Sequence, residues 1–116
     1  MNHEVIREFA LRFPHATEGF PFDESSLVFK VHGKIFAILN LGCQPPKINL
    51  KNCPERNTEL RETYEWIIPG YHANKQHWNT VIAVEYASWS LIKDMITTSY
   101  KLVWQKLPKK VQQGSI

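Results

Sequence analysis

The sequence has few cysteines and no long apolar run. Its 116 residues include only Cys43 and Cys53, which are too few for a disulfide framework. No stretch approaches the ~18 consecutive apolar residues of a transmembrane helix. Charged residues, among them Glu4 and Arg7, interrupt the apolar stretch near the N-terminus, which is not typical of a signal peptide. We therefore expect a cytoplasmic protein that does not enter a membrane.

Motifs that mark an enzyme are missing as well. There is no Gly-rich phosphate loop, no G-x-S-x-G sequence and no carboxylate pair with obvious acid and base roles. Cys53 precedes an expected helix, where a thiol pKa is lowered, but a cysteine of this kind is more often inert. A hydrolase or nuclease that uses His72 and His77 as acid and base stays open as an alternative. We predict that the protein is not an enzyme and has no catalytic residue.

The histidine and cysteine spacings do not predict a metal site. His72 and His77 have a spacing that zinc sites use, but the two cysteines lie too far apart in the sequence to complete the pattern. We expect no metal and no cofactor.

Acidic residues are absent from long parts of the chain, although the net charge is only +3. Residues 25–51 contain lysines and no acid, residues 71–84 contain no acid, and the tail after Asp94 is rich in lysine. This segregation can form a basic face that attracts polyanions. The same lysines can instead keep exposed strand edges soluble. Both interpretations stay open.

Apolar spacing predicts three helices. The first follows Asn2, a plausible N-cap, and ends at Pro14. The second begins at Pro54 and runs to about Tyr64, because proline favours the first helical position. The third begins near Ser88 and ends before residues 107–108.

Strand signals lie between these helices. Residues 27–31 and 34–39 predict a hairpin with a turn at residues 32–33, in which Phe29 lies opposite Phe36 and Lys30 opposite Ile35. Residues 47–51 alternate cleanly, so that Ile48 points inward and its neighbours point outward. A further strand is expected at residues 80–84, and residues 14–25 are expected to form a loop.

This order of elements predicts a two-layer α+β fold. Hairpins imply an antiparallel β-sheet, and one apolar stripe per helix implies helices packed on one face of that sheet. Residues 1–116 are expected to form a single domain. Apolar residues on both faces of the hairpin leave a monomer or a weak homodimer open.

Residues 69–79, PGYHANKQHWN, form the least ordinary segment. Asn and Gln can bond a base edge, Lys can meet a phosphate, and Tyr and Trp can stack on bases. The same residue types also suit a turn that leads into a strand, with Asn74 in the turn and Trp78 in the core. The residue types therefore leave both a binding role and a structural role open.

Several segments together resemble the MmcQ/YjbR family. They are FKVHGKIFA (29–37), INLK (48–51), PE (54–55), IIPGYHANKQHWNTV (67–81), SYKLV (99–103) and LPKK (107–110). The resemblance implies a small bacterial cytoplasmic protein with a CyaY-like α+β fold, of a family generally labelled DNA-binding. The chain departs from the family at Ala73, where Met is frequent, and at Gln76, where Lys is frequent. Before Pro54 it has Asn52 and Cys53, where the family tends to have Cys and then Asp.

The resemblance implies a DNA-binding protein, and we predict that it is regulatory in kind and has double-stranded DNA as its partner. The predicted nucleic-acid contacts are Lys30, Lys47, Lys51, Tyr71, His72, Asn74, Lys75, His77 and Asn79. The alternative is a module that uses residues 71–79 to bind a protein or a small acidic ligand. A deep pocket near His72, Lys75 and His77 favours the small ligand, and a flat basic stripe that continues to Lys47 and Lys51 favours nucleic acid.

Overall fold

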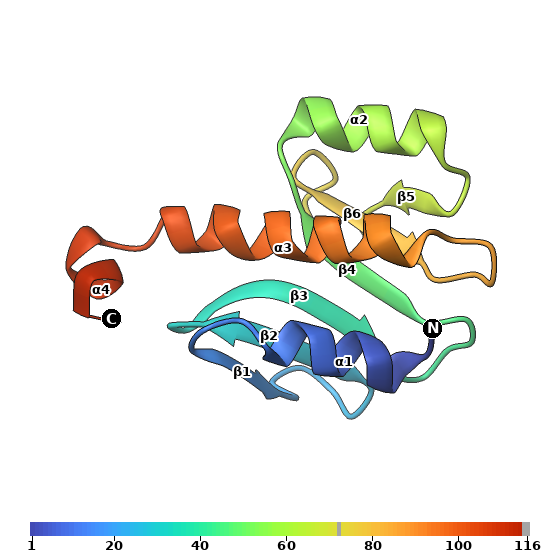
Figure 1. Ribbon diagram of the computed structural model, residues 1–116. Helices are drawn as coiled ribbons and strands as arrows, with labels where there is room; N and C mark the ends of the chain where they lie inside the picture. The colour runs from blue at the N-terminus through green and yellow to red at the C-terminus, as the bar shows by residue number, and fades with distance from the viewer. Residues whose placement is uncertain (72, 115–116) are drawn as a thin grey trace.

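The computed structural model describes residues 1–71 and 73–114 and shows an antiparallel sheet with helices on one face (Figure 1). The helices are α1 (His3–Leu11), α2 (Pro54–Thr63), α3 (Trp89–Gln105) and α4 (Lys109–Gly114). The strands are β1 (Ala16–Gly19), β2 (Ser26–Val31), β3 (Lys34–Asn40), β4 (Lys47–Lys51), β5 (Ile67–Pro69) and β6 (Trp78–Ile82). Their order across the sheet is β1-β2-β3-β4-β6-β5, and every neighbouring pair is antiparallel. The predicted α+β class is confirmed.

The three predicted helices are present with the expected caps. Asn2 Oδ1 accepts a hydrogen bond from Val5 N at 2.9 Å, and Ser88 Oγ accepts one from Leu91 N at 3.1 Å. Helix α4 was not anticipated. None of the helices in residues 1–71 and 73–114 is long and apolar enough to cross a membrane.

The hairpin turn is confirmed, but half of its predicted register is wrong. His32 and Gly33 both have positive φ, at 47° and 78°, as a two-residue hairpin turn of type I′ requires. Lys30 lies opposite Ile35 as predicted. Phe29, however, lies opposite Ala37, because the register shifts by one residue between Phe29 and Lys30. This bulge lets Phe29 and Phe36 enter the same core.

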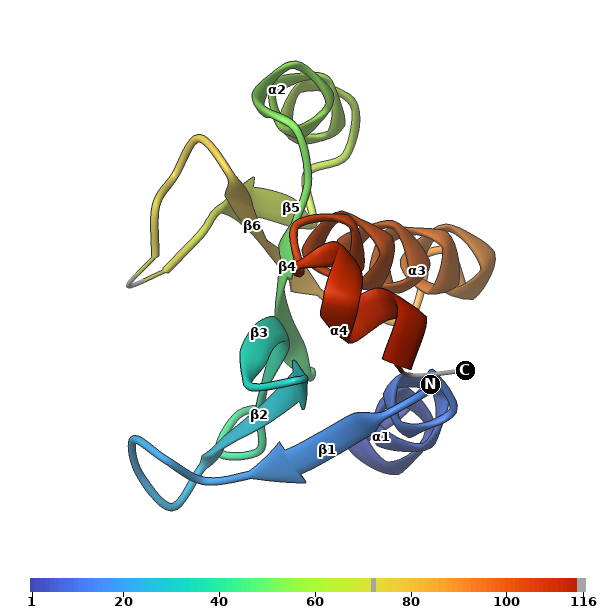
Figure 2. The same ribbon diagram turned by 90° about the vertical axis from the view of Figure 1, so that its left-hand side faces the viewer.

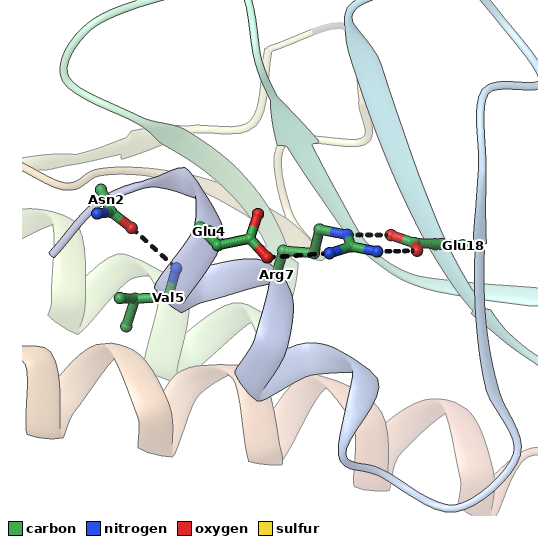
Figure 3. A network of polar contacts seen from close by, with 5 residues as sticks. All are labelled: Asn2, Glu4, Val5, Arg7 and Glu18. Carbon is green, nitrogen blue, oxygen red and sulfur yellow. Dashed lines mark hydrogen bonds and ion pairs between the residues drawn. The ribbon is translucent and has the colours of Figure 1, made fainter.

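The expected loop at residues 14–25 contains an edge strand, β1, which corrects the prediction. Arg7 of α1 donates two hydrogen bonds to the Glu18 carboxylate of β1, at 2.7 and 2.6 Å, and a third to Glu4 at 3.0 Å (Figure 3). The hydrogen bonds from Arg7 hold the pKa of the Glu18 carboxyl below its usual range. The pair therefore ties the first helix to the edge of the sheet.

Strand β4 shows why the sheet has two different faces. Ile48 and Leu50 are buried in the core with the helices, whereas Lys47 and Asn49 point to the other face, as predicted.

Strand β6 begins at Trp78, two residues earlier than expected, and ends at Ile82. Its Thr80 lies opposite Asn49. Trp78 is half-buried and is not a member of the core cluster.

We call the face away from α1 and α3 the open face, because none of the described helices covers it (Figure 2). Two loops project from it, the β1–β2 loop (residues 20–25) and the β5–β6 loop (residues 70–71 and 73–77). Helix α2 lies beside β5 and β6 at one end of the sheet. The open face and its two loops form the setting of the candidate site.

Candidate functional site

A hollow of about 770 Å³ lies on the open face, and we call it the open-face hollow. Its floor includes Ile38, Asn49, Thr80 and Ile68, which are successive cross-strand neighbours on β3, β4, β6 and β5. Directly opposite residues in an antiparallel sheet have Cβ atoms about 5 Å apart, so these four side chains form one continuous row. The row is apolar at both ends and polar in the middle.

A second row of the floor carries the positive charge. Ser26, Asn40 and Lys47 lie opposite one another on β2, β3 and β4. Asn40 Oδ1 accepts a hydrogen bond from Gly42 N at 2.8 Å. Lys47 is exposed, and its ammonium makes no ion pair or hydrogen bond with a described residue. Lys47 is also the one basic residue among the described lining of the hollow.

Three hydrogen bonds connect Asn49 and Thr80, in the middle of the floor, with each other and with the backbone of Tyr71 in the β5–β6 loop. Thr80 Oγ1 donates to Asn49 Oδ1 at 2.6 Å and accepts from Tyr71 N at 3.0 Å. Asn49 Nδ2 donates to the Tyr71 carbonyl at 3.1 Å. Two adjacent strands thereby fix the backbone of Tyr71 at the wall of the hollow.

Asp23 shapes the opposite wall. Its Oδ1 accepts from Ser25 N at 2.9 Å and from Ser26 N at 2.6 Å, and its Oδ2 accepts from Ser26 Oγ at 3.1 Å. The hydrogen bonds from the two backbone amides lower the pKa of the Asp23 carboxyl. Asp23 thus acts as an ionised brace of the β1–β2 loop.

The two walls bear exposed aromatic side chains. Phe22 is 65% exposed on the β1–β2 loop, and Tyr71 is 69% exposed on the β5–β6 loop. Ile68, at the edge of the floor, is 38% exposed. Large apolar side chains that line one hollow are typical of a ligand-binding surface.

Several polar side chains of the unusual segment 69–79 make hydrogen bonds that hold the β5–β6 loop in its conformation. Asn74 Oδ1 accepts from Gln76 N at 2.9 Å and from His77 N at 3.2 Å, which closes an Asx turn. Lys75 Nζ donates to the Gly70 carbonyl at 3.1 Å. A Cβ atom on Gly70 would lie 2.8 Å from the Trp78 Cβ, so glycine is needed for this close approach.

Helix α2 holds the other side of this loop through residues that the sequence did not single out. Arg61 Nη1 donates to the Lys75 carbonyl at 2.8 Å, and Asn57 Nδ2 donates to the Gln76 carbonyl at 3.0 Å. Asn79 is buried and donates to the Asn57 carbonyl at 3.3 Å. The sequence signal that could have indicated them is the spacing of Asn57 and Arg61, two polar residues at i and i+4 on a helix with few apolar residues.

Comparison with known proteins decides the family. The YjbR family model matches residues 11–102. The chain belongs to the YjbR family. YbdF of Escherichia coli O157:H7 is 38% identical over 96% of this chain and 91% of its own length. YjbR of Escherichia coli K12 is 27% identical over 95% of this chain and 93% of its own length.

Solved structures of similar proteins have the same fold. The crystal structure of Deinococcus radiodurans protein DR2400, a DUF419 domain, superposes with a TM-score of 0.93 at 34% identity. It covers 97% of this chain and 86% of the other. A Pseudomonas syringae protein superposes with a TM-score of 0.76 at 26% identity, over 89% of this chain and 99% of the other. The predicted MmcQ/YjbR membership is confirmed.

Within this YjbR-family chain, the predicted contact residues do not line one hollow. Lys47 and Tyr71 line the open-face hollow, while Lys30 lies in a separate hollow of about 400 Å³ with Phe20 and Val28. Lys51 lies beside Lys106 at the end of α3. Burial lowers the pKa of the Lys51 ammonium, and the charge of Lys106 lowers it further.

Among the remaining predicted contacts, Asn74, Lys75 and His77 lie in the β5–β6 loop, and Asn79 lies on β6. Asn74, Lys75 and Asn79 hold the loop together through the bonds given above. His77 is half-buried, and its carbonyl accepts from Asn52 N at 2.9 Å. His72 lies outside the described residues. Phe22, Asp23, Asn40 and Thr80 were not singled out in the sequence.

Proposed function

We propose that this protein is a binding module for a small ligand, which occupies the open-face hollow. The observation that carries the proposal is the concave shape of the hollow between two braced loops. Its volume of about 770 Å³ falls within the ~300–1,000 Å³ of small-molecule sites. A single lysine among its described lining residues supports a discrete ligand more than a long polyanion.

The described lining of the hollow supports binding without chemistry. Its titratable side chains are Asp23, Lys47 and Tyr71. Asp23 is occupied in bracing its own loop, so it is a poor general base. Among the described residues, no Ser, Thr or Cys of the lining bonds a histidine, as an activated nucleophile would.

Tyr71→Ala is expected to weaken ligand binding about three- to tenfold, since one aromatic contact contributes about 0.5–1.5 kcal/mol. The assay is a screen of small aromatic and acidic compounds by amide NMR, followed by a titration of each compound that binds. Binding in the hollow should shift the Asn49 and Thr80 amide signals. Tyr86→Ala is the matched control, because Tyr86 is 68% exposed outside the described lining. Its affinity should equal that of the native protein.

The proposed function would be wrong if all compounds that bind shifted signals elsewhere and left Asn49 and Thr80 unchanged. It would also be wrong if Tyr71→Ala and Tyr86→Ala had equal effects.

DNA binding is the second candidate. Lys30 and Lys47 both lie on the open face, and neither makes an ion pair with a described residue. On this candidate, affinity for duplex DNA falls steeply with salt, because neutralised phosphates release counterions. The double variant Lys30→Glu/Lys47→Glu should then abolish most binding in a fluorescence-anisotropy titration. Native binding no tighter than millimolar at ~50 mM salt would remove this candidate.

A further inference from the structure

The end of the open-face hollow that contains Lys47 has hydrogen-bond donors from which no described residue accepts. Lys47 and Asn40 lie directly opposite each other on β4 and β3. The Lys47 ammonium carries three N–H donors, and no described residue accepts from them. The Asn40 carboxamide is oriented by its bond from Gly42 N to Oδ1, and its Nδ2 donates to no described residue. Two adjacent donor groups, one of them charged, can therefore both donate to a ligand.

The carboxylate and carboxamide oxygens of Asp23 and Asn49, by contrast, already accept hydrogen bonds. The Asp23 carboxylate accepts from Ser25 and Ser26 through both of its oxygens. Asn49 Oδ1 accepts from Thr80, and Thr80 Oγ1 accepts from Tyr71 N. A ligand gains little by donating into this site and much by accepting from it. Charge-assisted bonds to Lys47 favour a carboxylate or phosphate over a neutral acceptor.

The rest of the hollow suits a flat apolar body. Phe22 and Tyr71 offer exposed aromatic rings from the two walls, and Ile38 and Ile68 lie at the two ends of the floor row. Aromatic rings pack well on planar partners, by stacking or edge-to-face. The free donors of Asn40 and Lys47 belong to the Ser26–Asn40–Lys47 row, which lies beside the row that contains these isoleucines.

We infer that the ligand is a planar organic anion, whose carboxylate or phosphate binds Lys47 and Asn40 and whose flat body lies between Phe22 and Tyr71. This inference rests on the proposed function of the same hollow. It adds the chemical class of the ligand and the residues that select its charge.

Two pairs of probes test the charge requirement. Indole-3-acetate and tryptamine share a ring but carry opposite charges, and adenosine 5′-monophosphate and adenosine differ by a phosphate. Titrations followed by amide NMR give both the affinity and the place of binding. The anionic member of at least one pair should bind in the hollow about 10- to 100-fold more tightly, as a charge-assisted bond of about 1.5–3 kcal/mol requires. The pair that shows the preference separates a carboxylate from a phosphate ligand.

Two variants locate the effect. Lys47→Gln should abolish the preference for the anion, and Lys34→Gln should keep it, because Lys34 is an exposed lysine at the start of β3 and outside the described lining. Asn40→Asp retains the oxygen that accepts from Gly42 and adds a negative charge. This variant should reverse the preference toward the cationic or neutral member.

The outcomes separate the two proposals. If the probes bind at the Asn49 and Thr80 floor with equal affinity for both charges, the anion inference is overturned and the small-ligand function stands. An unchanged preference in Lys47→Gln overturns the inference in the same way. If all four probes bind no tighter than millimolar or shift only signals elsewhere, the inference is overturned, and the wider screen then decides the proposed function.

Discussion

Ser99→Ala is expected to lower the free energy of unfolding by about 2–4 kcal/mol, because it leaves a buried backbone carbonyl and a partly buried backbone N–H without partners. Ser99 is fully buried on α3. Its hydroxyl donates to the Phe36 carbonyl at 2.5 Å and accepts from Lys51 N at 2.9 Å. The last pair of the β3–β4 ladder is Ala37 with Leu50, so Phe36 and Lys51 would form the next pair. The hydroxyl therefore replaces a strand-to-strand bond at the point where the strands separate.

Urea denaturation measures this effect, and Ser90→Ala is the matched control. Ser90 lies in the first turn of the same helix and is exposed, so its removal should change stability by less than about 0.5 kcal/mol. Equal midpoints for the two variants would show that the Ser99 bridge does not stabilise the fold.

Asn57→Leu is expected to lower the free energy of unfolding by about 1–3 kcal/mol and to loosen the β5–β6 loop. Asn57 is 1% exposed, and its Nδ2 donates to the carbonyls of Asn52 and Gln76. Leucine has a similar size but leaves both carbonyls unpaired. Because the loop carries Tyr71, we expect ligand affinity to fall together with stability.

Amide hydrogen exchange can detect this loosening. Exchange at residues 76–78 should accelerate at least tenfold in Asn57→Leu, since Asn74 protects these amides only while the loop is held. Glu62→Gln, an exposed change on the same helix, should leave exchange unchanged. Equal exchange in both variants would contradict the role of α2 as the support of the loop.

The elements that sequence predicted well are those with local signals. Asn2 and Ser88 cap their helices through bonds within one turn, and the turn at His32 and Gly33 needs only its own backbone angles. Strand β1 has no such signal, because Ala16–Gly19 is short, mostly polar and held by pairing with β2. The bulge near Phe29 likewise follows from packing two large rings in the core.

The candidate site was predictable only in part, because it is assembled from separate stretches. Alternation along β4 places Lys47 and Asn49 on one face. It does not reveal that Thr80 lies beside Asn49, or that the loop with Phe22 forms a wall. The segment 69–79 attracted attention for residue types that suit binding. In the structure, most of those types build the support for Tyr71.

The two-sided character of β4 also affects how the protein can evolve. Residues 47 and 49 face the open-face hollow and residues 48 and 50 face the core, so selection on the surface and selection on the core act on alternate positions of one strand. Substitutions at 47 or 49 can change the lining of the hollow while the interior keeps its packing. An insertion of one residue would exchange the two faces and lose both properties together. Relatives with new ligands are therefore expected to differ by substitutions in this strand and to keep its length.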